Sequence, residues 1–322
     1  MTCTLKQLAE QLNLSIGTVS LALRNSPLVA EKTRKRVTEL AESQDYVQIS
    51  FGRALQSRCS ELIGVLIPTL TSSFFNELLQ GAGEASIAAG YGLMLGWVTE
   101  DREYAAPQIN LMLEKEVDAL IVASNGSCFG TYAQRFLRRS KPVVFCNAVP
   151  AENCSSVRTD DVLGGRLAVE AMVRYGHKKL LCCQRFQPRW EGNTLAAQQY
   201  NVELSGFETY QDALEKFRRD LGITGIVAHS DEEASLILQH LREMGYSEKR
   251  DFSIIGYNDM SIASHPGFQL TTIAQHRKAL GASSVEIAIN MLNDPESGNV
   301  HKLLNPFLVE RNTLRPPCRR TR

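Results

Sequence analysis

A short stretch near the N-terminus, from Ser15 to Leu21, carries side chains suited to contact with DNA. Ser15 offers a hydroxyl that can cap the start of a helix, and the hydroxyls of Thr18 and Ser20 follow within two turns. A helix that reads a DNA groove presents the residues of its first turns. Pairs of amphipathic helices are also common in small helical bundles that bind no ligand. The spacing of apolar residues alone does not distinguish a DNA-binding head from such a bundle.

The residues on either side predict the helices that would position this stretch. Leu5, Leu8 and Leu12 recur at helical spacing, and the pattern breaks at Asn13 before the second helix begins. Within the second helix, Val19 is expected to face the first one. A third helix follows after a short turn, so the first 46 residues are predicted to form a helix-turn-helix head.

From residue 62 onward the hydrophobic period changes. Short apolar runs typical of buried strands alternate with helical stretches, and they lie at 62–68, 92–98, 119–123 and 142–147, and again at 179–184, 202–204, 225–229 and 252–256. This alternation predicts an α/β body with two doubly wound parallel-sheet subdomains. Such sheets bind ligands at the carboxyl ends of their strands, which points to residues 69–75, residues 124–126 and Asn147.

Composition narrows the class of protein. The chain has 322 residues and no net charge, although residues 1–60 hold eight Lys or Arg against five Asp or Glu, an excess of three. The eight cysteines form no C-x-x-C pair and no zinc spacing with histidine, so we expect reduced thiols, no metal and no cofactor. No apolar signal or membrane segment is present, which predicts a cytoplasmic protein that does not enter a membrane.

Motifs for catalysis are missing from the sequence. We find no Walker loop, no G-x-S-x-G and no G-x-G-x-x-G after a strand, since Gly81-Ala82-Gly83 lies inside a predicted helix. Asp160 and Asp161 are adjacent in an extended segment, so their side chains are expected to point to opposite sides. The sequence therefore does not predict an enzyme.

The string Thr18-Val19-Ser20, a third helix around residues 33–37 and a closing Tyr46 together resemble the head of the LacI/GalR family of bacterial transcription regulators. The resemblance extends through nearly the whole chain. It implies DNA contacts in the head by Ser15, Ile16, Gly17, Thr18, Ser20, Leu21, Asn25 and Thr33. Among these, Ile16, Gly17 and Leu21 correspond to base-reading positions, and their apolar character suits contact with thymine methyl groups. Ala30 replaces a serine that usually caps the third helix.

The same resemblance makes residues 47–60 a hinge segment that folds on the operator. Arg53 and Leu55 would contact DNA there, with Leu55 at the position that wedges between base pairs in the minor groove. Gln48, Ile49 and Gly52 depart from the usual pattern, so folding of this hinge is expected to depend more strongly on DNA.

In the body, the resemblance implies an effector site formed by Phe74, Asp160, Arg189, Ser230 and Asn258. Arg189 begins an R-x-x-G-x-x-x-A pattern whose guanidinium holds hydroxyls or carboxylates of the effector. Ser230 and Asn258 replace the usual Asn and Asp, and the segment after Arg189 is shorter than usual in the family. The alternative for Phe74 is that its ring packs in the hydrophobic core. His177 is expected to have a structural role.

These features predict four regions: a head at 1–46, a hinge at 47–60, a first subdomain at 61–158 and 274–298, and a second at 159–273 and 299–322. The basic tail has no leucine heptads, so a homodimer is expected. The predicted function is that of a transcription repressor that binds double-stranded operator DNA and responds to a sugar-like metabolite bound between the subdomains. A cytoplasmic sugar-binding module and a sugar-active enzyme are the alternatives.

Overall fold

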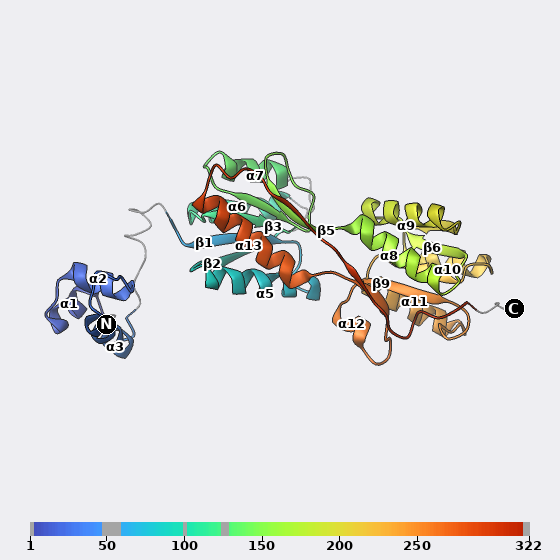
Figure 1. The fold of residues 1–322 in the computed structure, drawn as a ribbon, viewed down its shortest axis with the longest axis horizontal. Helices are drawn as coiled ribbons and strands as arrows, with labels where there is room; N and C mark the ends of the chain where they lie inside the picture. The colour runs from blue at the N-terminus through green and yellow to red at the C-terminus, as the bar shows by residue number, and fades with distance from the viewer. Residues whose placement is uncertain (1–2, 47–58, 99–101, 124–128, 318–322) are drawn as a thin grey trace. The chain divides into compact units, whose positions relative to one another are not determined.

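The structure is a computed structural model that describes residues 3–46, 59–98, 102–123 and 129–317. It divides into two compact units, Met1–Ser60 and Glu61–Arg322. Figure 1 shows the described part of the first unit as helices and the second unit as two sheets with helices on both faces. The α/β class with a helical head is thereby confirmed. Among the described residues, no helix has the length and apolarity that crossing a bilayer requires.

The head contains three helices, α1 (Leu5–Leu12), α2 (Ile16–Leu23) and α3 (Glu31–Ser43). Leu8, Val19 and Val37 are fully buried at its centre, one from each helix, as the apolar spacing predicts for Val19. Ala30 precedes α3 and makes no side-chain capping hydrogen bond, which agrees with the loss of the usual serine.

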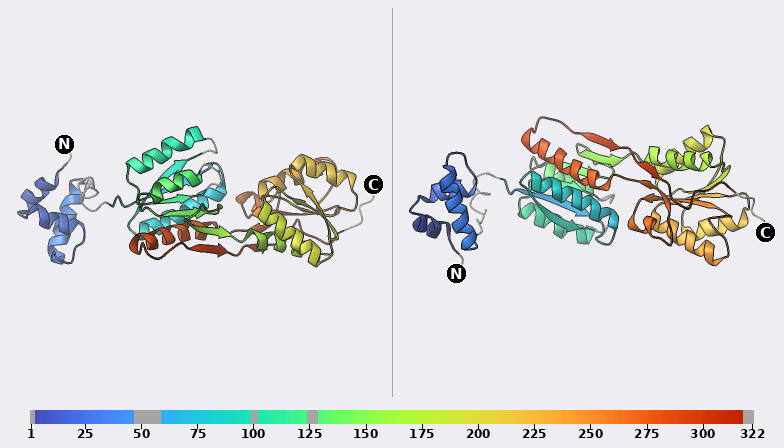
Figure 2. Two further views of the ribbon diagram at one scale, coloured as in Figure 1. Left: turned by 90° about the horizontal axis from the view of Figure 1, so that it is seen from above. Right: turned by 60° about the horizontal axis from the view of Figure 1, so that its bottom comes forward.

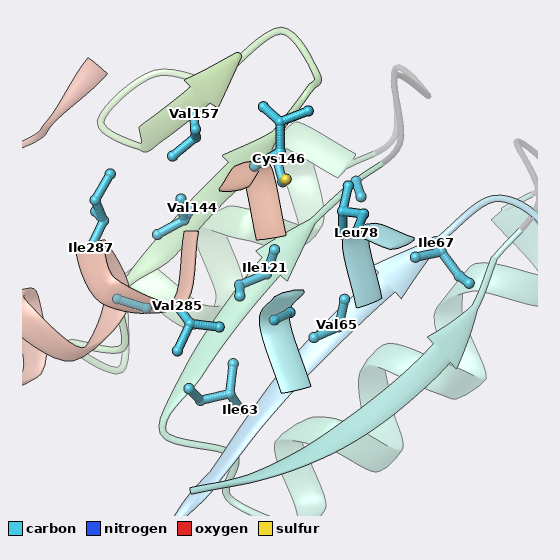
Figure 3. Close-up of a cluster of buried hydrophobic side chains, with 14 of the residues drawn as sticks. Ile63, Val65, Ile67, Leu78, Ile121, Val144, Cys146, Val157, Val285 and Ile287 are labelled. Atoms are coloured by element: carbon cyan, nitrogen blue, oxygen red, sulfur yellow. The ribbon is translucent and has the colours of Figure 1, made fainter. Parts of the chain in front are cut away.

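The first sheet of the body has six strands. In spatial order they are β11 (His301–Leu304), β5 (Ser155–Thr159), β4 (Val143–Cys146), β3 (Ala119–Val122), β1 (Leu62–Ile67) and β2 (Gly92–Trp97), all parallel. Its helices are α5 (Ser73–Ala88), α6 (Arg102–Glu114), α7 (Phe129–Leu137) and α13 (Arg277–Asn293). Val65, Ile121 and Val144 point from successive strands into one apolar core beneath α5 and α13 (Figure 3).

The second sheet repeats this order. Its strands are β12 (Phe307–Val309), β10 (Thr271–Ala274), β9 (Ser253–Asn258), β8 (Gly225–Val227), β6 (Lys179–Cys183) and β7 (Glu203–Phe207), with only β12 antiparallel. Its helices are α8 (Asp161–Arg174), α9 (Gln187–Gln199), α10 (Tyr210–Arg219), α11 (Asp231–Glu243) and α12 (Ser261–Ser264). His177 is buried among them and bonds Thr224 and the Arg315 carbonyl, a structural role as expected.

Three segments cross between the sheets, after β5, after β10 and after β11 (Figure 2). We expected residues 299–322 to belong to the second subdomain, and for β11 this is wrong, because it pairs with β5 in the first sheet. The strand is mostly exposed and contains His301 and Lys302, so it lacks the apolar run that identified the others. The third crossing therefore follows Leu304.

In the Gly81-Ala82-Gly83 string, which does not follow a strand as a nucleotide-binding loop would, Gly81 has a role in helix packing. It lies within α5, where a Cβ atom would come within 2.0 Å of the Lys278 carbonyl oxygen of α13. Gly281 of α13 is equally close to the Leu78 carbonyl oxygen, at 1.9 Å. Gly81 and Gly281 let the two helix backbones approach each other, so Gly81 serves helix packing.

Candidate nucleic-acid interface and ligand cleft

The start of α2 is fixed by its own hydroxyls. Ser15 Oγ accepts a hydrogen bond from the Thr18 backbone N–H at 3.1 Å and lies 2.8 Å from Thr18 Oγ1. A capped first turn holds the adjacent side chains in one orientation at little entropic cost on binding. The sequence prediction of a cap at Ser15 is confirmed.

The first turn of α2 faces solvent. Ile16 is 49% exposed, and Gly17 is also exposed, so neither is used by the head's own core. Leu21, on the next turn, is only half-buried and packs against that core. Of the three residues assigned to base reading, Ile16 and Gly17 are exposed, and Leu21 is half-buried.

The remaining polar candidates of the head lie at or near its surface. Ser20 and Thr33 are half-buried, and Asn25 is exposed in the turn after α2 with a φ of 56°. In the basic run of α3, Arg34 Nη1 donates to the Ser26 carbonyl at 2.9 Å, so this guanidinium braces the turn. The hinge candidates Arg53 and Leu55, with Gln48, Ile49 and Gly52, lie outside the described residues.

We call the parts of the body built on the first and the second sheet the first and the second lobe. In the second lobe, four groups contact the Arg189 side chain. Its Nε donates to Asp161 Oδ1 at 2.7 Å, and its Nη1 donates to the His229 carbonyl at 2.8 Å. The guanidinium carbon lies 3.5 Å from the centroid of the Tyr257 ring and 5.1 Å from that of Phe186. The Tyr257 hydroxyl also donates to Asp161 Oδ1, at 3.0 Å. Arg189 therefore joins α8, α9 and β9.

The pattern around Arg189 also closes the contact between α8 and α9. A Cβ atom at Gly192 would lie 2.0 Å from the Val162 carbonyl oxygen, and one at Gly165 would lie 2.2 Å from the Arg189 carbonyl oxygen. Ala196, four residues after Gly192, is fully buried. The R-x-x-G-x-x-x-A pattern thus has a structural reason that requires no ligand.

Beside Arg189, His229 is kept neutral. Burial, together with the positive charges of Arg189 and Arg185, lowers the pKa of its imidazole to about 3. Arg185 in turn pairs with Glu233, whose other oxygen accepts from the His229 backbone N–H at 2.8 Å. The charged side chains of Arg185 and Arg189 are therefore both paired with carboxylates of the chain.

The other predicted effector residues also have internal partners. Asp160 caps α8 by accepting from the Leu163 N–H at 2.9 Å, and Ser230 caps α11 by accepting from the Glu233 N–H at 3.3 Å. Phe74 is 7% exposed and belongs to the core of the first lobe, which favours the core alternative for this residue.

A polar chain links Asn258 to the strands that cross between the lobes. Gln275 Nε2 donates to Asn258 Oδ1 at 2.6 Å, and the Thr159 hydroxyl donates to Gln275 Oε1 at 2.5 Å. The Thr159 backbone N–H then donates to Asn147 Oδ1 at 3.3 Å. Two of the three crossings are therefore hydrogen-bonded to each other at the ends of β4, β5, β9 and β10.

Asp231 is a further buried polar residue that the sequence prediction missed. Thr272 Oγ1 donates to its Oδ1, and the Met260 N–H donates to its Oδ2, each at 2.6 Å. Burial raises the pKa of this carboxyl to about 7, against the opposing effect of the two hydrogen bonds. The only sequence feature that pointed to Asp231 was its position next to Ser230, a predicted effector residue. The burial of its side chain could not be predicted from the sequence.

A cavity of about 150 Å³ lies between the two lobes. Its lining residues are Asn147, Ala148, Val149, Arg158, Thr159, Asp160, Asp161, Val162, Phe186, Pro188 and Leu303. Of the residues implied by the family resemblance, Asp160 lines it, and so does Asn147, which was predicted from its place at the end of a strand. The sequence did not predict that Arg158 and Leu303 line a ligand cavity, because neither belongs to a recognisable motif. Arg158 is nevertheless only two residues from Asp160. No group of three metal-ligating side chains occurs in the part of the chain that the structure describes.

Three protein-family models match this chain. Residues 4–48 match "Bacterial regulatory proteins, lacI family", residues 60–199 match "Periplasmic binding proteins and sugar binding domain of LacI family", and residues 169–314 match "Periplasmic binding protein-like domain". The first match covers the helical head, and the other two, which overlap over residues 169–199, together cover the two-sheet body.

Characterised proteins similar to this chain are repressors. The HTH-type transcriptional repressor CytR of Escherichia coli (strain K12) is 24% identical over 329 residues, covering 97% of this chain and 96% of CytR. The ribose operon repressor of Haemophilus influenzae is 24% identical over 328 residues, covering 97% of this chain and 98% of that protein.

Solved structures agree in fold. The lac repressor dimer bound to operator and the anti-inducer ONPF has a TM-score of 0.82 at 20% identity, covering 98% of this chain and 100% of that chain. A LacI family transcriptional regulator from Enterococcus faecium with bound ribose has a TM-score of 0.68 at 26% identity, covering 79% of this chain and 99% of that chain.

Proposed function

The chain belongs to the LacI family of bacterial regulatory proteins, and we propose that it represses transcription by binding operator DNA through α2 and is controlled by a small polar metabolite bound in its body. The observation that carries the DNA-binding half is the capped first turn of α2 with Ile16 and Gly17 turned to solvent. An apolar side chain left exposed on a rigid helix start suits contact with base edges.

The head residues that we assign to DNA are Ser15, Ile16, Gly17, Thr18, Ser20, Leu21, Asn25 and Thr33, with Arg53 and Leu55 in the hinge. Two heads in a homodimer would read the halves of a pseudo-palindromic site. The lac repressor, a relative in fold, is a dimer on its operator. We place the protein in the cytoplasm, where the chromosome is.

The metabolite is proposed to bind between the lobes. Relatives of the body have been solved with ribose and with cellobiose, and the family model for residues 60–199 includes sugar-binding domains. A ligand that favours one rotation of the lobes would act through the crossing segments, which are joined by Thr159 and Gln275. Coupling of this kind is typically about 1–3 kcal/mol and is reciprocal.

A gel-shift experiment with DNA flanking the protein's own coding sequence tests this proposal. We expect a complex that persists in excess unrelated DNA, and equal affinity for flanking and unrelated DNA would contradict it. A thermal-shift screen of free and phosphorylated sugars tests the sensing half, because a ligand of the folded state raises the melting temperature. Turnover of any of these sugars would favour the alternative of a sugar-active enzyme.

A further inference from the structure

Arg158 is the residue of the interlobe cavity whose side chain the fold leaves unused. It lies on β5 opposite Leu303 of β11, and both residues line the cavity. Its Nε is buried and has no hydrogen-bond partner, and no hydrogen bond or ion pair of its guanidinium is found within the described residues. A buried polar group without a partner is costly, so such a group in a cavity is available to bind a ligand.

The neighbouring arginines show the contrast. Arg189 is paired with Asp161 and Arg185 with Glu233. In each case a carboxylate of the chain neutralises the guanidinium. Arg158 carries the same charge beside the same cleft without such a carboxylate, so a carboxylate or phosphate from outside the chain is the natural partner for its planar fork.

Two acidic residues also line the cavity, and they limit what the ligand can be. Asp161 is already held by Arg189 and Tyr257. Asp160 accepts the N–H of Leu163 through one oxygen, and its negative charge faces a ligand in the same cavity. A simple anion would be repelled there, whereas a ligand that also carries a hydroxyl could donate a hydrogen bond to Asp160.

We propose that Arg158 binds the carboxylate or phosphate of a small hydroxylated metabolite in this cavity, so that the effector is an acidic sugar derivative. The inference rests on the proposed function and specifies the effector's chemistry. The volume of about 150 Å³ is below the roughly 300–1,000 Å³ of most ligand pockets. The ligand is therefore expected to be a single small unit, and apolar side chains such as Phe186 and Pro188 enclose its carbon frame.

Thermal-shift and calorimetric titrations of the full chain test this inference, with glucose, gluconate, glucose 6-phosphate and inorganic phosphate as probes at constant ionic strength. Gluconate or glucose 6-phosphate is expected to bind saturably and more tightly than glucose, and the stronger of the two identifies the anionic group. Arg158→Gln is expected to weaken that binding at least about tenfold, because a charge-assisted pair is lost.

The matched control is Arg219→Gln, which removes one guanidinium from the exposed surface of α10 and leaves the cavity intact. It is expected to bind the acidic probes as the unchanged protein does. Glucose binding as tightly as the acidic probes, no binding of either acidic probe, or equal binding by the Arg158→Gln variant would each overturn the inference. Binding of inorganic phosphate alone, unaffected by Arg158→Gln, would be an adventitious ion only and would also overturn it. Operator binding in the gel shift is independent of all these results and tests the proposed function separately.

Discussion

The first turn of α2 and the cleft wall around Arg189 differ in how far their side chains are already engaged within the chain. Ile16 and Gly17 lie exposed on a capped helix, whereas Arg189 is bonded to Asp161 and to the His229 carbonyl. A surface that reads DNA must remain available, because its partner supplies the contacts. A wall that shapes a small cavity must instead be rigid before the ligand arrives. The comparison suggests that Arg189 is a positioning residue and that Arg158 is the group that meets the ligand.

The largest expected effect concerns Arg189. Arg189→Ala leaves Asp161, whose side chain is 11% exposed, as a buried carboxylate without its cation. We expect the free energy of unfolding of the body to fall by about 3–5 kcal/mol in chemical denaturation, and any metabolite response to be lost while the head still binds the operator. The double variant Asp161→Asn with Arg189→Met should recover much of the loss. Unchanged stability of Arg189→Ala would contradict the positioning role.

The next effect concerns the head. Ile16→Asp places a carboxylate on the exposed first turn of α2, toward the phosphates of bound DNA, and should weaken operator binding by about a hundredfold in fluorescence anisotropy. Thermal stability should not change, because Ile16 is 49% exposed and an acidic residue suits a helix N-terminus. Gln11→Glu is the matched control, since it adds the same charge on α1. Equal losses for the two variants would mean that α2 has no special place in the interface.

A smaller effect is expected in the hinge. Leu55→Ala removes the side chain assigned to the minor-groove wedge and should weaken operator binding about tenfold while hardly changing binding to unrelated DNA. Competition titrations with the two kinds of DNA measure the ratio. The same loss on both would argue against a wedge at this position.

A last effect, which grows with pH, is a pH dependence of the stability of the body. Because the pKa of Asp231 is raised to about 7 in the folded state from 3.8, folding favours its protonated form, and this stabilisation is lost as the pH rises from about 4 to about 7. Asp231→Asn mimics the protonated carboxyl and removes this dependence. Its stability relative to the unchanged protein should therefore rise by about 1 kcal/mol per pH unit in that window, measured by urea unfolding. A difference that stays constant with pH would contradict the assignment.

Much of the fold was predictable because strand and helix periods are local properties of the sequence. The three helices of the head and the alternation of strands and helices follow directly from apolar spacing, as Val19 and the run at 62–67 illustrate. The strand β11 was missed because its polar residues carry no such period.

The candidate site was less predictable than the fold. Arg189 was predicted to bind the effector, but its engagement by Tyr257 and Asp161 depends on contacts between residues far apart in the chain. Arg158 was overlooked because the significance of an arginine lies in whether a carboxylate reaches it. That property exists only in three dimensions.

Selection of binding sites from a randomised double-stranded DNA library by the full chain tests the central claim most directly. The account predicts enrichment of one inverted repeat, whose half-sites are bound by the two heads of a dimer, and loss of that enrichment with Ile16→Asp. Recovery of sequences without an inverted repeat, or an identical enrichment by the Ile16→Asp variant, would contradict it.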